Sequence, residues 1–576
     1  MHELVIRGGT IVDGAGAAAY TGDVAIDEDR ISALGKVVDK GRREIDADGL
    51  LVTPGWVDIH THYDGQVTWD SQVAPSSLHG VTSVVYGNCG VGFAPARTGE
   101  DDHAFLISLM EGVEDIPGTA LAEGLAWDWE SIPEYLDAVD RRPHTIDLGA
   151  QVPHAALRAY VMGARGANHE EDPTPEEIGR MAELTAEALE AGAVGFATSR
   201  TLNHRTKTGQ KIGSLTASSE ELLGIADALR RTGKGVLQVV SDFKSFDYEM
   251  GMMRRMAELS GRPLSVSLIQ ADQRPDRWRD VLAYIDRAAA DGLDMKAQIA
   301  ARPVGLLVGL NGSMHPYVKT PTYKAQLRGL PVAEQARRMR DPELRAALLA
   351  EAREVRGGLF AGVAKQAHKL FELGDPPEYE PAPEQSIAAK AQRAGVDPME
   401  LVYDILTAGD GDGMLYYPAG NYSAGNLDAA REMVLHERTV PGLSDGGAHV
   451  SFICDASFPT YNIVHWARDR SRGEKLPLEF MVKRQTLDTA RHVGWNDRGR
   501  LAVGCLADVN VIDFDRLALR PPEMVHDLPA GGKRLMQKAE GYRYTIKRGQ
   551  VTFVDGVATG VLPGQVVRGA QAAPTA

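Results

Sequence analysis

Short apolar runs recur along the middle of the chain, and stretches with a helical spacing of apolar positions separate most of them. The two clearest helices start after Thr174 and Ser218, each followed three residues later by the glutamate of a capping box, and end before Gly192 and Gly233. The apolar runs predict eight strands, at residues 55–60, 81–87, 146–152, 193–198, 235–241, 263–269, 294–299 and 440–445. Eight buried strands alternating with helices predict an α/β protein with a (β/α)8 barrel of the TIM type.

Both ends of the chain have a different pattern, in which short apolar runs are separated by turn residues. Residues 1–53 contain no helical spacing, and residues 499–569 include a hairpin pattern between Tyr542 and Gly556. A sheet as short as either end could form would leave its apolar face uncovered. We therefore expect one β-sandwich domain built from both termini, with residues 570–576 as a tail.

The barrel pattern, which spans residues 54–498, is interrupted between the seventh and eighth predicted strands. The interruption covers about residues 303–400, and its segment from Pro331 to Glu354 is charged, alanine-rich and helical in pattern. An excursion of this length between two barrel strands is typical of a lid or small subdomain over the mouth. We expect such a subdomain here.

Composition excludes several classes of function. The net charge of −17 and the absence of a basic stripe argue against a nucleic-acid partner. Three cysteines are too few for a disulfide framework and suit a reducing compartment. No stretch has the pattern of a signal peptide or of a membrane span. We expect a cytoplasmic protein that acts on a small molecule, and the sequence does not determine whether it forms a homo-oligomer.

Two histidines lie at the end of the first predicted barrel strand, in the segment Thr-Pro-Gly-Trp-Val-Asp-Ile-His60-Thr-His62. Side chains at positions i and i+2 of a strand point the same way, and barrel enzymes carry their chemistry at the carboxyl ends of the strands. Two imidazoles at such an end form half of a zinc or iron site. For a bare pair of this spacing, the alternative is two exposed histidines in a turn.

Other strand ends carry further reactive groups. Cys89 follows the second strand and could be a thiolate ligand or a small buried cysteine. Asp445 ends the eighth strand before two glycines and could be a metal ligand and general base or an Asx-turn cap. His154 follows the third strand, and alone it would more often be a hydrogen-bonded structural histidine.

Together these motifs resemble the amidohydrolase superfamily, and more closely its N-acyl-D-amino-acid deacylase (D-aminoacylase) branch. The resemblance covers nearly the whole chain and includes the motifs at residues 53–62, 87–90, 110–117, 124–129, 443–446 and 504–508. It implies a metal-bearing (β/α)8 barrel with a sandwich from both termini. It also implies that His60, His62 and Asp445 are metal ligands, that Cys89 takes the place of the family's cysteine ligand, and that Asp445 also carries the proton.

The chain departs from the family at the fifth and sixth strands. The family has a metal-binding histidine at each, whereas this chain has Gln238 and Ser267 in the corresponding strands and no histidine in either. The fourth strand offers no lysine for carboxylation. Glutamine and serine are weak ligands for zinc. The sequence therefore predicts one Zn²⁺ ion, or another divalent metal.

Three functions remain open at this point. The first is hydrolysis of the amide bond of an N-acyl-D-amino acid or a related N-acyl compound, with Zn²⁺ held by His60, His62 and Asp445, Cys89 near or completing the ligand set, and Asp445 taking the proton of the attacking water. The second is a changed reaction on the same barrel, on a cyclic amide or carbamate or by a non-hydrolytic lyase step. The third is an inactive binding or assembly protein, which has no need for this set of residues.

The candidates for substrate contacts come from strand ends and from the insertion. Arg302 follows the seventh strand and would suit a carboxylate, although a surface arginine is the alternative. His449 lies four residues past Asp445, and His315 lies in the insertion. The third-strand motif of the family has a histidine where His154 stands, which adds His154 to these candidates.

Overall fold

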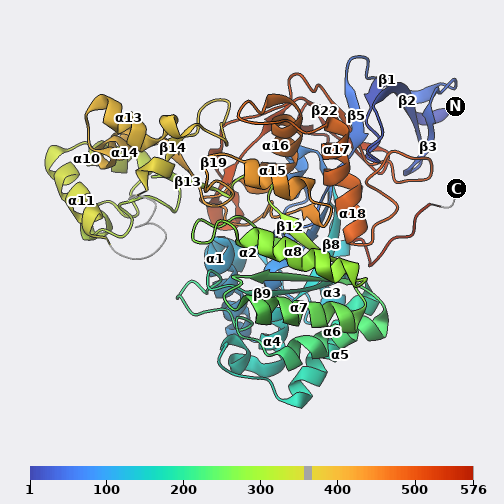
Figure 1. Ribbon diagram of the computed structural model, residues 1–576, viewed down its shortest axis with the longest axis horizontal. Coiled ribbons are helices and arrows are strands. Elements are labelled where there is room, and N and C mark those ends of the chain that lie inside the picture. Colours follow the sequence, from blue (N-terminus) through green and yellow to red (C-terminus); the bar gives the residue numbers. More distant parts are fainter. Residues whose placement is uncertain (356–365, 575–576) are drawn as a thin grey trace.

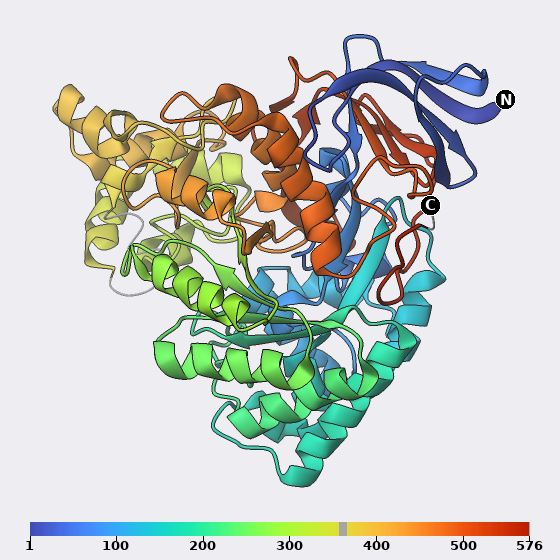
Figure 2. The ribbon, with the colours of Figure 1, turned by 45° about the vertical axis from the view of Figure 1, so that its right-hand side comes forward.

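The computed structural model describes residues 1–355 and 366–574, which form three parts. The central part is a barrel, the second is a sheet built from both ends of the chain, and the third is an insertion with its own helices. Figures 1 and 2 show the insertion and the terminal sheet on opposite sides of the barrel.

The barrel consists of eight parallel strands. In chain order they are β6 (Trp56–Asp58), β7 (Val81–Tyr86), β8 (Asp147–Pro153), β9 (Gly195–Arg200), β10 (Val236–Ser241), β11 (Leu264–Leu268), β12 (Met295–Ile299) and β16 (Thr439–Pro441). Each pairs with its neighbour along this order, and a parallel bridge between Thr61 and Gly446 brings the last strand back to the first. The predicted (β/α)8 barrel is confirmed.

Helices cover the outside of the barrel (Figure 1). They include α3 (Ile132–Asp140), α4 (His154–Met162), α5 (Pro175–Ala191), α6 (Ser219–Thr232), α7 (Phe246–Ser260), α8 (Arg277–Ala290) and α15 (Asp428–Leu435). The predicted helix ends are confirmed: Thr174 and Ser218 accept a hydrogen bond from the backbone three residues later, and Gly192 and Gly233 end α5 and α6 in the left-handed conformation.

The eighth strand is shorter than the predicted 440–445. It ends at Pro441, and the chain then turns because Leu443 and Asp445 have φ angles of 59° and 48°. Left-handed conformations at non-glycine residues cost energy and persist where the surroundings fix them. Asp445 therefore lies in a turn beyond the strand rather than at its last position.

The terminal sheet has nine strands. They are β1 (His2–Ile11), β2 (Tyr20–Asp27), β3 (Arg30–Gly35), β4 (Gly41–Asp46) and β5 (Leu51–Pro54) from the first end, and β17 (Val509–Ile512), β22 (Tyr542–Lys547), β23 (Gln550–Val554) and β24 (Val557–Ala558) from the other. The two ends join where β17 pairs antiparallel with β5. Buried side chains from both ends, such as Ile6, Val24, Val509 and Ile546, form one core. The expectation of a β domain from both termini is confirmed.

The segment between β17 and β22 leaves this sheet and runs to the barrel. It contains β18 (Ala518–Leu519), β21 (Ala539–Glu540) and a hairpin of β19 (Glu523–Leu528) and β20 (Gly532–Met536). The Leu535 N–H donates to the Val450 carbonyl at 2.6 Å, and the Lys533 amine donates to the Asn311 carbonyl at 2.6 Å. The hairpin therefore lies between the loop after β16 and the insertion.

The insertion has a three-stranded sheet and its own core. The elements are β13 (Gly305–Gly309), α9 (Pro321–Gln326), α10 (Val332–Met339), α11 (Pro342–Glu354), β14 (Phe371–Glu372), α13 (Ile387–Ala394), α14 (Pro398–Thr407) and β15 (Met414–Pro418). Leu306, Leu348, Val402 and Leu415 are among its buried residues. The helical segment predicted at 331–354 is two helices, because Asp341 caps a second helix that starts at Pro342.

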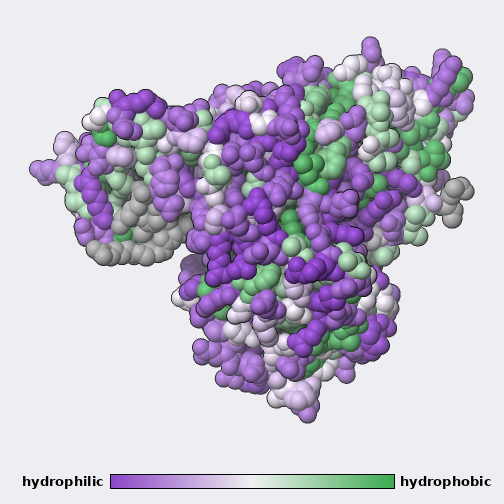
Figure 3. All heavy atoms as spheres, viewed as in Figure 1, coloured by the Kyte–Doolittle hydropathy of each residue, from purple (hydrophilic) through white to green (hydrophobic). Residues whose placement is uncertain are grey.

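The surface seen in Figure 3 is mostly hydrophilic, with small hydrophobic patches. Within residues 1–355 and 366–574, no helix has both the length and the apolar character needed to cross a membrane. At the end of the chain, Gln571 pairs with Trp495, and residues 575–576 lie outside the described part.

Candidate metal centre

Backbone pairing brings Asp445 next to both histidines of the first strand. The Asp445 N–H donates to the His60 carbonyl at 3.2 Å, and the His62 N–H donates to the Gly446 carbonyl at 2.8 Å. The two segments can approach this closely because Gly446 and Gly447 have no side chain. A Cβ on Gly447 would lie 2.9 Å from the His62 carbonyl oxygen. The two glycines after Asp445 are thus a requirement of barrel closure.

Cys89 reaches the same point from a tight turn after β7. Gly87, Cys89 and Gly90 all have positive φ angles, of 82°, 57° and 70°. The Asn88 side chain fixes this turn by donating to the carbonyls of Thr61 and Val85. Because Thr61 separates the two histidines, the turn that carries Cys89 is attached to the segment that carries His60 and His62.

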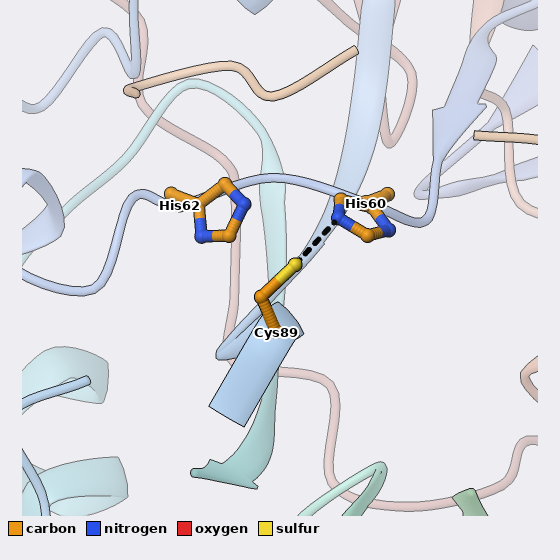
Figure 4. Close-up of side chains that lie close together, drawn as sticks. All are labelled: His60, His62 and Cys89. Carbon is orange, nitrogen blue, oxygen red and sulfur yellow. Dashed lines mark hydrogen bonds between the residues drawn. The ribbon is translucent and has the colours of Figure 1, made fainter. Parts of the chain in front are cut away.

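The four side chains converge on a small volume. Nε2 of His60 lies 3.4 Å from Cys89 Sγ and 3.4 Å from Asp445 Oδ1, and Nε2 of His62 lies 3.6 Å from Asp445 Oδ1. Ligand atoms of His60, His62 and Cys89 all lie within 4.8 Å of one another. Figure 4 shows the Cys89 sulfur directed toward the two rings.

These separations and donor types fit a transition-metal ion. A tetrahedral zinc site with bonds of about 2.0–2.3 Å has neighbouring ligand atoms about 3.3–3.8 Å apart. The three separations of 3.4, 3.4 and 3.6 Å fall within this range. Two imidazoles, a thiolate and a carboxylate are donors that zinc and similar divalent ions accept. The residues present therefore fit a bound divalent metal.

Polar side chains of the fifth, sixth and seventh barrel strands surround the cluster. They form hydrogen bonds with one another and with the cluster. Gln238 Oε1 accepts from the Cys89 N–H at 3.0 Å, and its Nε2 donates to Ser267 Oγ at 3.1 Å. Gln298 Oε1 lies 2.6 Å from His60 Nδ1, and its Nε2 donates to Ser265 Oγ at 3.0 Å. The oxygen and the nitrogen of each side-chain amide are thus already engaged in hydrogen bonds.

Glu114 is a member of the site that the sequence analysis did not single out. It is the last residue of α1 (Glu100–Glu114) and is 1% exposed. Its Oε1 lies 3.2 Å from His62 Nδ1, and its Oε2 lies 3.6 Å from His449 Nε2. The signal was present, because Glu114 belongs to the 110–117 motif that carries the family resemblance.

His204 also faces the site and was also missed. It lies four residues past β9, where its Nδ1 is 2.8 Å from Ser199 Oγ. Burial, followed by the electrostatic effect of the neighbouring His62, lowers the pKa of His204 to about 3. No pattern in the sequence distinguishes this loop histidine, because its position depends on tertiary contacts such as the one with Ser199.

The charges of the side chains in this cluster follow from burial and mutual contacts. Burial lowers the pKa of His60 to about 4 and raises the pKa of Cys89 to about 11. Burial opposes charge on His62, yet the Glu114 carboxylate and Asp445 hold its pKa well above the ordinary value. Burial also opposes charge on Asp445, but hydrogen bonding to His62 and the charge of His60 keep its pKa well below the usual range.

Of the predicted substrate-binding residues, His449 lies at the cluster and three do not. Arg302 is 0% exposed, 3.0 Å from Asp455. His154 is buried between Thr198 and Glu221, at 2.8 and 3.0 Å. His315 is buried in the insertion, and its ring centroid lies 4.7 Å from that of Tyr323. Each of these three side chains is thus held by a neighbour of its own.

Comparison with known proteins gives the family. The model of the amidohydrolase family (Amidohydro_3) matches residues 43–553. An N-acyl-D-glutamate deacylase of Alcaligenes xylosoxydans xylosoxydans is 28% identical over 90% of this chain and 88% of that protein. A D-aminoacylase of the same organism is 34% identical, but the match spans only 34% of this chain and 37% of that protein.

Solved structures of the same kind share the fold. A D-aminoacylase with a binuclear metal centre has a TM-score of 0.65 at 22% identity, with 99% of this chain and all of that chain covered. An N-acyl-D-glutamate deacylase from Bordetella bronchiseptica, complexed with zinc and a phosphonate inhibitor, has a TM-score of 0.64 at 24% identity, covering 98% and 99% of the two chains. Because the family model covers most of the sequence, the chain belongs to the amidohydrolase family and is a hydrolase of carbon–nitrogen bonds other than peptide bonds.

Proposed function

We propose that this protein deacylates N-acyl-D-amino acids with the help of one divalent metal ion, zinc by the chemistry of its donors. The observation that carries the proposal is the convergence of His60, His62, Cys89 and Asp445, in which the separations from His60 to Cys89, from His60 to Asp445 and from His62 to Asp445 match the edges of a tetrahedral site. The curated relatives named above support the substrate class, because their names specify D-aminoacylase and N-acyl-D-glutamate deacylase activity.

One ion, rather than two, is favoured by the surroundings of the cluster. A second ion would need donors from the fifth and sixth strands, and both amide atoms of Gln238 are engaged with Cys89 and Ser267. Glutamine and serine are also poor zinc ligands. We infer that the hydrogen-bonded pair of Gln238 and Ser267 occupies the region that a second ion would need.

When bound, the metal supplies a Lewis acid that makes water acidic enough to be a nucleophile near neutral pH. Asp445 is the side chain that takes the proton from the attacking water, because its carboxylate is ionised and its side chain is 18% exposed. It then gives this proton to the departing amine nitrogen, which would otherwise leave as an unstable anion. His60, His62 and Glu114 are nearly fully buried and exclude water from the other side.

For the substrate's carboxylate we propose His449. Its side chain is 20% exposed, and its Nδ1 makes no hydrogen bond within the described residues. A buried nitrogen without a partner at the edge of the site is suited to receive a ligand atom. The substrate-binding roles first predicted for Arg302, His154 and His315 stay predictions.

The test is a substrate panel with the purified, metal-loaded protein. N-acyl-D-amino acids, their L enantiomers and cyclic amides such as hydantoins are compared by release of free amine, with Asp445→Asn as the negative control. We expect turnover of the D compounds only. Turnover restricted to cyclic amides would replace the proposal with the changed-substrate alternative, and release of an unsaturated product without water uptake would indicate a lyase.

A further inference from the structure

Glu114 lies at the junction of the metal centre and the barrel mouth. It ends α1, and the chain turns immediately after it because Asp115 has a φ angle of 54°. This turn directs the Glu114 carboxylate into the barrel, where it is 1% exposed, while Asp115 accepts hydrogen bonds from Ser313 and Ser451. The end of α1 is therefore fixed by the buried Glu114 on one side and by the hydrogen bonds of Asp115 on the other.

The Glu114 carboxylate contacts two histidines with different surroundings. Oε1 lies 3.2 Å from His62 Nδ1, whose other nitrogen faces Asp445 at 3.6 Å. Oε2 lies 3.6 Å from His449 Nε2, and the His449 backbone N–H also donates to the Glu114 carbonyl. His449 has a φ angle of 51°, a conformation that requires such fixing contacts.

Buried carboxylates are costly unless they are paired with charge or hydrogen-bonding groups. Among the described residues, Oε2 of Glu114, Nδ1 of His62 and Nδ1 of His449 make no hydrogen bond of good geometry although all three atoms are buried. These three atoms belong to side chains that contact one another. Small rotations of the two imidazole rings on ligand binding would therefore complete their hydrogen bonds.

We propose that Glu114 is a positioning residue that sets two groups at once, His62 for the metal and His449 for the substrate carboxylate. By holding a proton on Nδ1 of His62, it leaves Nε2 free as the metal donor, the arrangement that carboxylates impose on ligating histidines. By holding Nε2 of His449, it leaves Nδ1, which has no hydrogen-bond partner among the described residues, for the substrate. The second half of this inference rests on the proposed deacylase function, whereas the first half rests on the metal alone.

The experiment compares Glu114→Gln and Glu114→Ala with a matched control, Glu111→Gln. Glu111 lies one turn earlier on α1, and its carboxylate pairs with Lys207 outside the cluster. Zinc affinity is measured by chelator competition, and kcat and KM are measured with an N-acyl-D-amino acid. Removal of such a carboxylate typically lowers metal affinity by about 10- to 100-fold. We expect this loss for Glu114→Ala, a smaller one for the isosteric Glu114→Gln, and none for the control.

A double-mutant cycle tests the contact with His449. If Glu114 acts on the substrate through His449, Glu114→Gln raises KM in the wild-type background and has no further effect on KM in a His449→Gln background. Additive effects would assign Glu114 a general structural role and overturn this half of the inference.

If both Glu114 variants fold and bind zinc with wild-type affinity, the inference that Glu114 positions His62 for the metal is overturned. Failure of the deacylase proposal would be recognised separately, as a wild-type protein that binds zinc and hydrolyses none of the D compounds. The affinity measurements would still decide the role of Glu114 toward His62.

Discussion

Nδ1 of His60 and Oε1 of Gln298 meet at 2.6 Å inside the barrel. The direction of this hydrogen bond is fixed by the residues behind it. Ser265 donates its hydroxyl to the Leu237 carbonyl, so its oxygen accepts from Gln298 Nε2, and the amide oxygen must face His60. His60 Nδ1 is therefore the protonated nitrogen, and Nε2 is left unprotonated toward Cys89 and Asp445.

The first prediction follows from this chain of hydrogen bonds. Gln298→Leu removes the acceptor for His60 Nδ1 while roughly keeping the volume. We expect zinc affinity to fall by about 10- to 100-fold, because the tautomer and ring orientation of a ligating histidine depend on such a partner. Chelator competition measures the change. Ser265→Ala, which leaves Gln298 in place, should have a smaller effect, and equal effects of the two variants would contradict the argument.

A second prediction concerns Asp445. Asp445→Asn keeps the size of the side chain but removes the base, so kcat should fall by about 10²- to 10⁴-fold. The circular dichroism spectrum and melting temperature should remain close to wild type. Zinc content is measured in parallel to separate loss of the base from loss of the ion. A variant with bound zinc and wild-type kcat would remove Asp445 as the proton acceptor.

Much of the fold could be predicted from the sequence because its signals are local. Capping residues such as Thr174 and Ser218 set helix ends within a few positions, and apolar runs identify buried strands without tertiary information. The short eighth strand could not be predicted, because it ends where tertiary contacts hold Leu443 and Asp445 in left-handed conformations. The excursion of β19 and β20 to the insertion likewise depends on contacts with distant residues such as Asn311.

The residues of the candidate site likewise fall into those that the sequence could predict and those that it could not. The residues at strand ends, such as His60 and Cys89, could be found because barrel topology brings all strand ends to one side. Glu114 belongs to a helix, where a glutamate is ordinarily exposed, and its burial depends on contacts with His62 and His449. Arg302 is paired with Asp455, and this pairing could not be predicted because Asp455 lies far along the chain. Pairings of this kind depend on the tertiary structure alone.

The role of the thiolate gives a third prediction. In Cys89→Ala the ligand set loses its soft donor, and we expect zinc affinity to fall at least tenfold while His60, His62 and Asp445 still bind some metal. The double variant His60→Ala/His62→Ala should lose the metal completely. Inductively coupled plasma mass spectrometry after dialysis measures both. Unchanged affinity in Cys89→Ala would limit the ligand set to the two histidines and Asp445.

The number of bound metal ions can be tested by introducing further metal-binding side chains. The wild-type protein should bind about one equivalent of zinc, because Gln238 and Ser267 are engaged with each other. Gln238→His/Ser267→His introduces two imidazoles near Cys89, whose N–H contacts Gln238 at 3.0 Å. We expect this variant to bind two equivalents in an isothermal titration. Two equivalents in the wild-type protein would refute the inference of a single ion.

The last prediction concerns stability at the junction of the barrel and the terminal sheet. Asp147 begins β8 and is 0% exposed, with its Oδ2 2.6 Å from Arg498 and 2.8 Å from Lys547. Burial opposes its charge, but these cations hold its pKa well below the ordinary value of 3.8. Removing one partner of a buried ion pair typically costs about 3–5 kcal/mol, because the other charge remains buried. Asp147→Asn should lower the free energy of unfolding by this amount at pH 7.

The pH dependence of this difference distinguishes charge from packing. Because the folded-state pKa of Asp147 lies below that of the unfolded chain, its stabilisation is fully present above pH 3.8 and is lost as the pH falls further. The gap between wild type and Asp147→Asn should therefore be constant from pH 7 to pH 5 and shrink progressively below pH 3.8, in urea unfolding of the metal-free proteins. A gap that is unchanged in acid would show that the substitution acts through packing around Arg498 and Lys547, since protonation would then have no part in it.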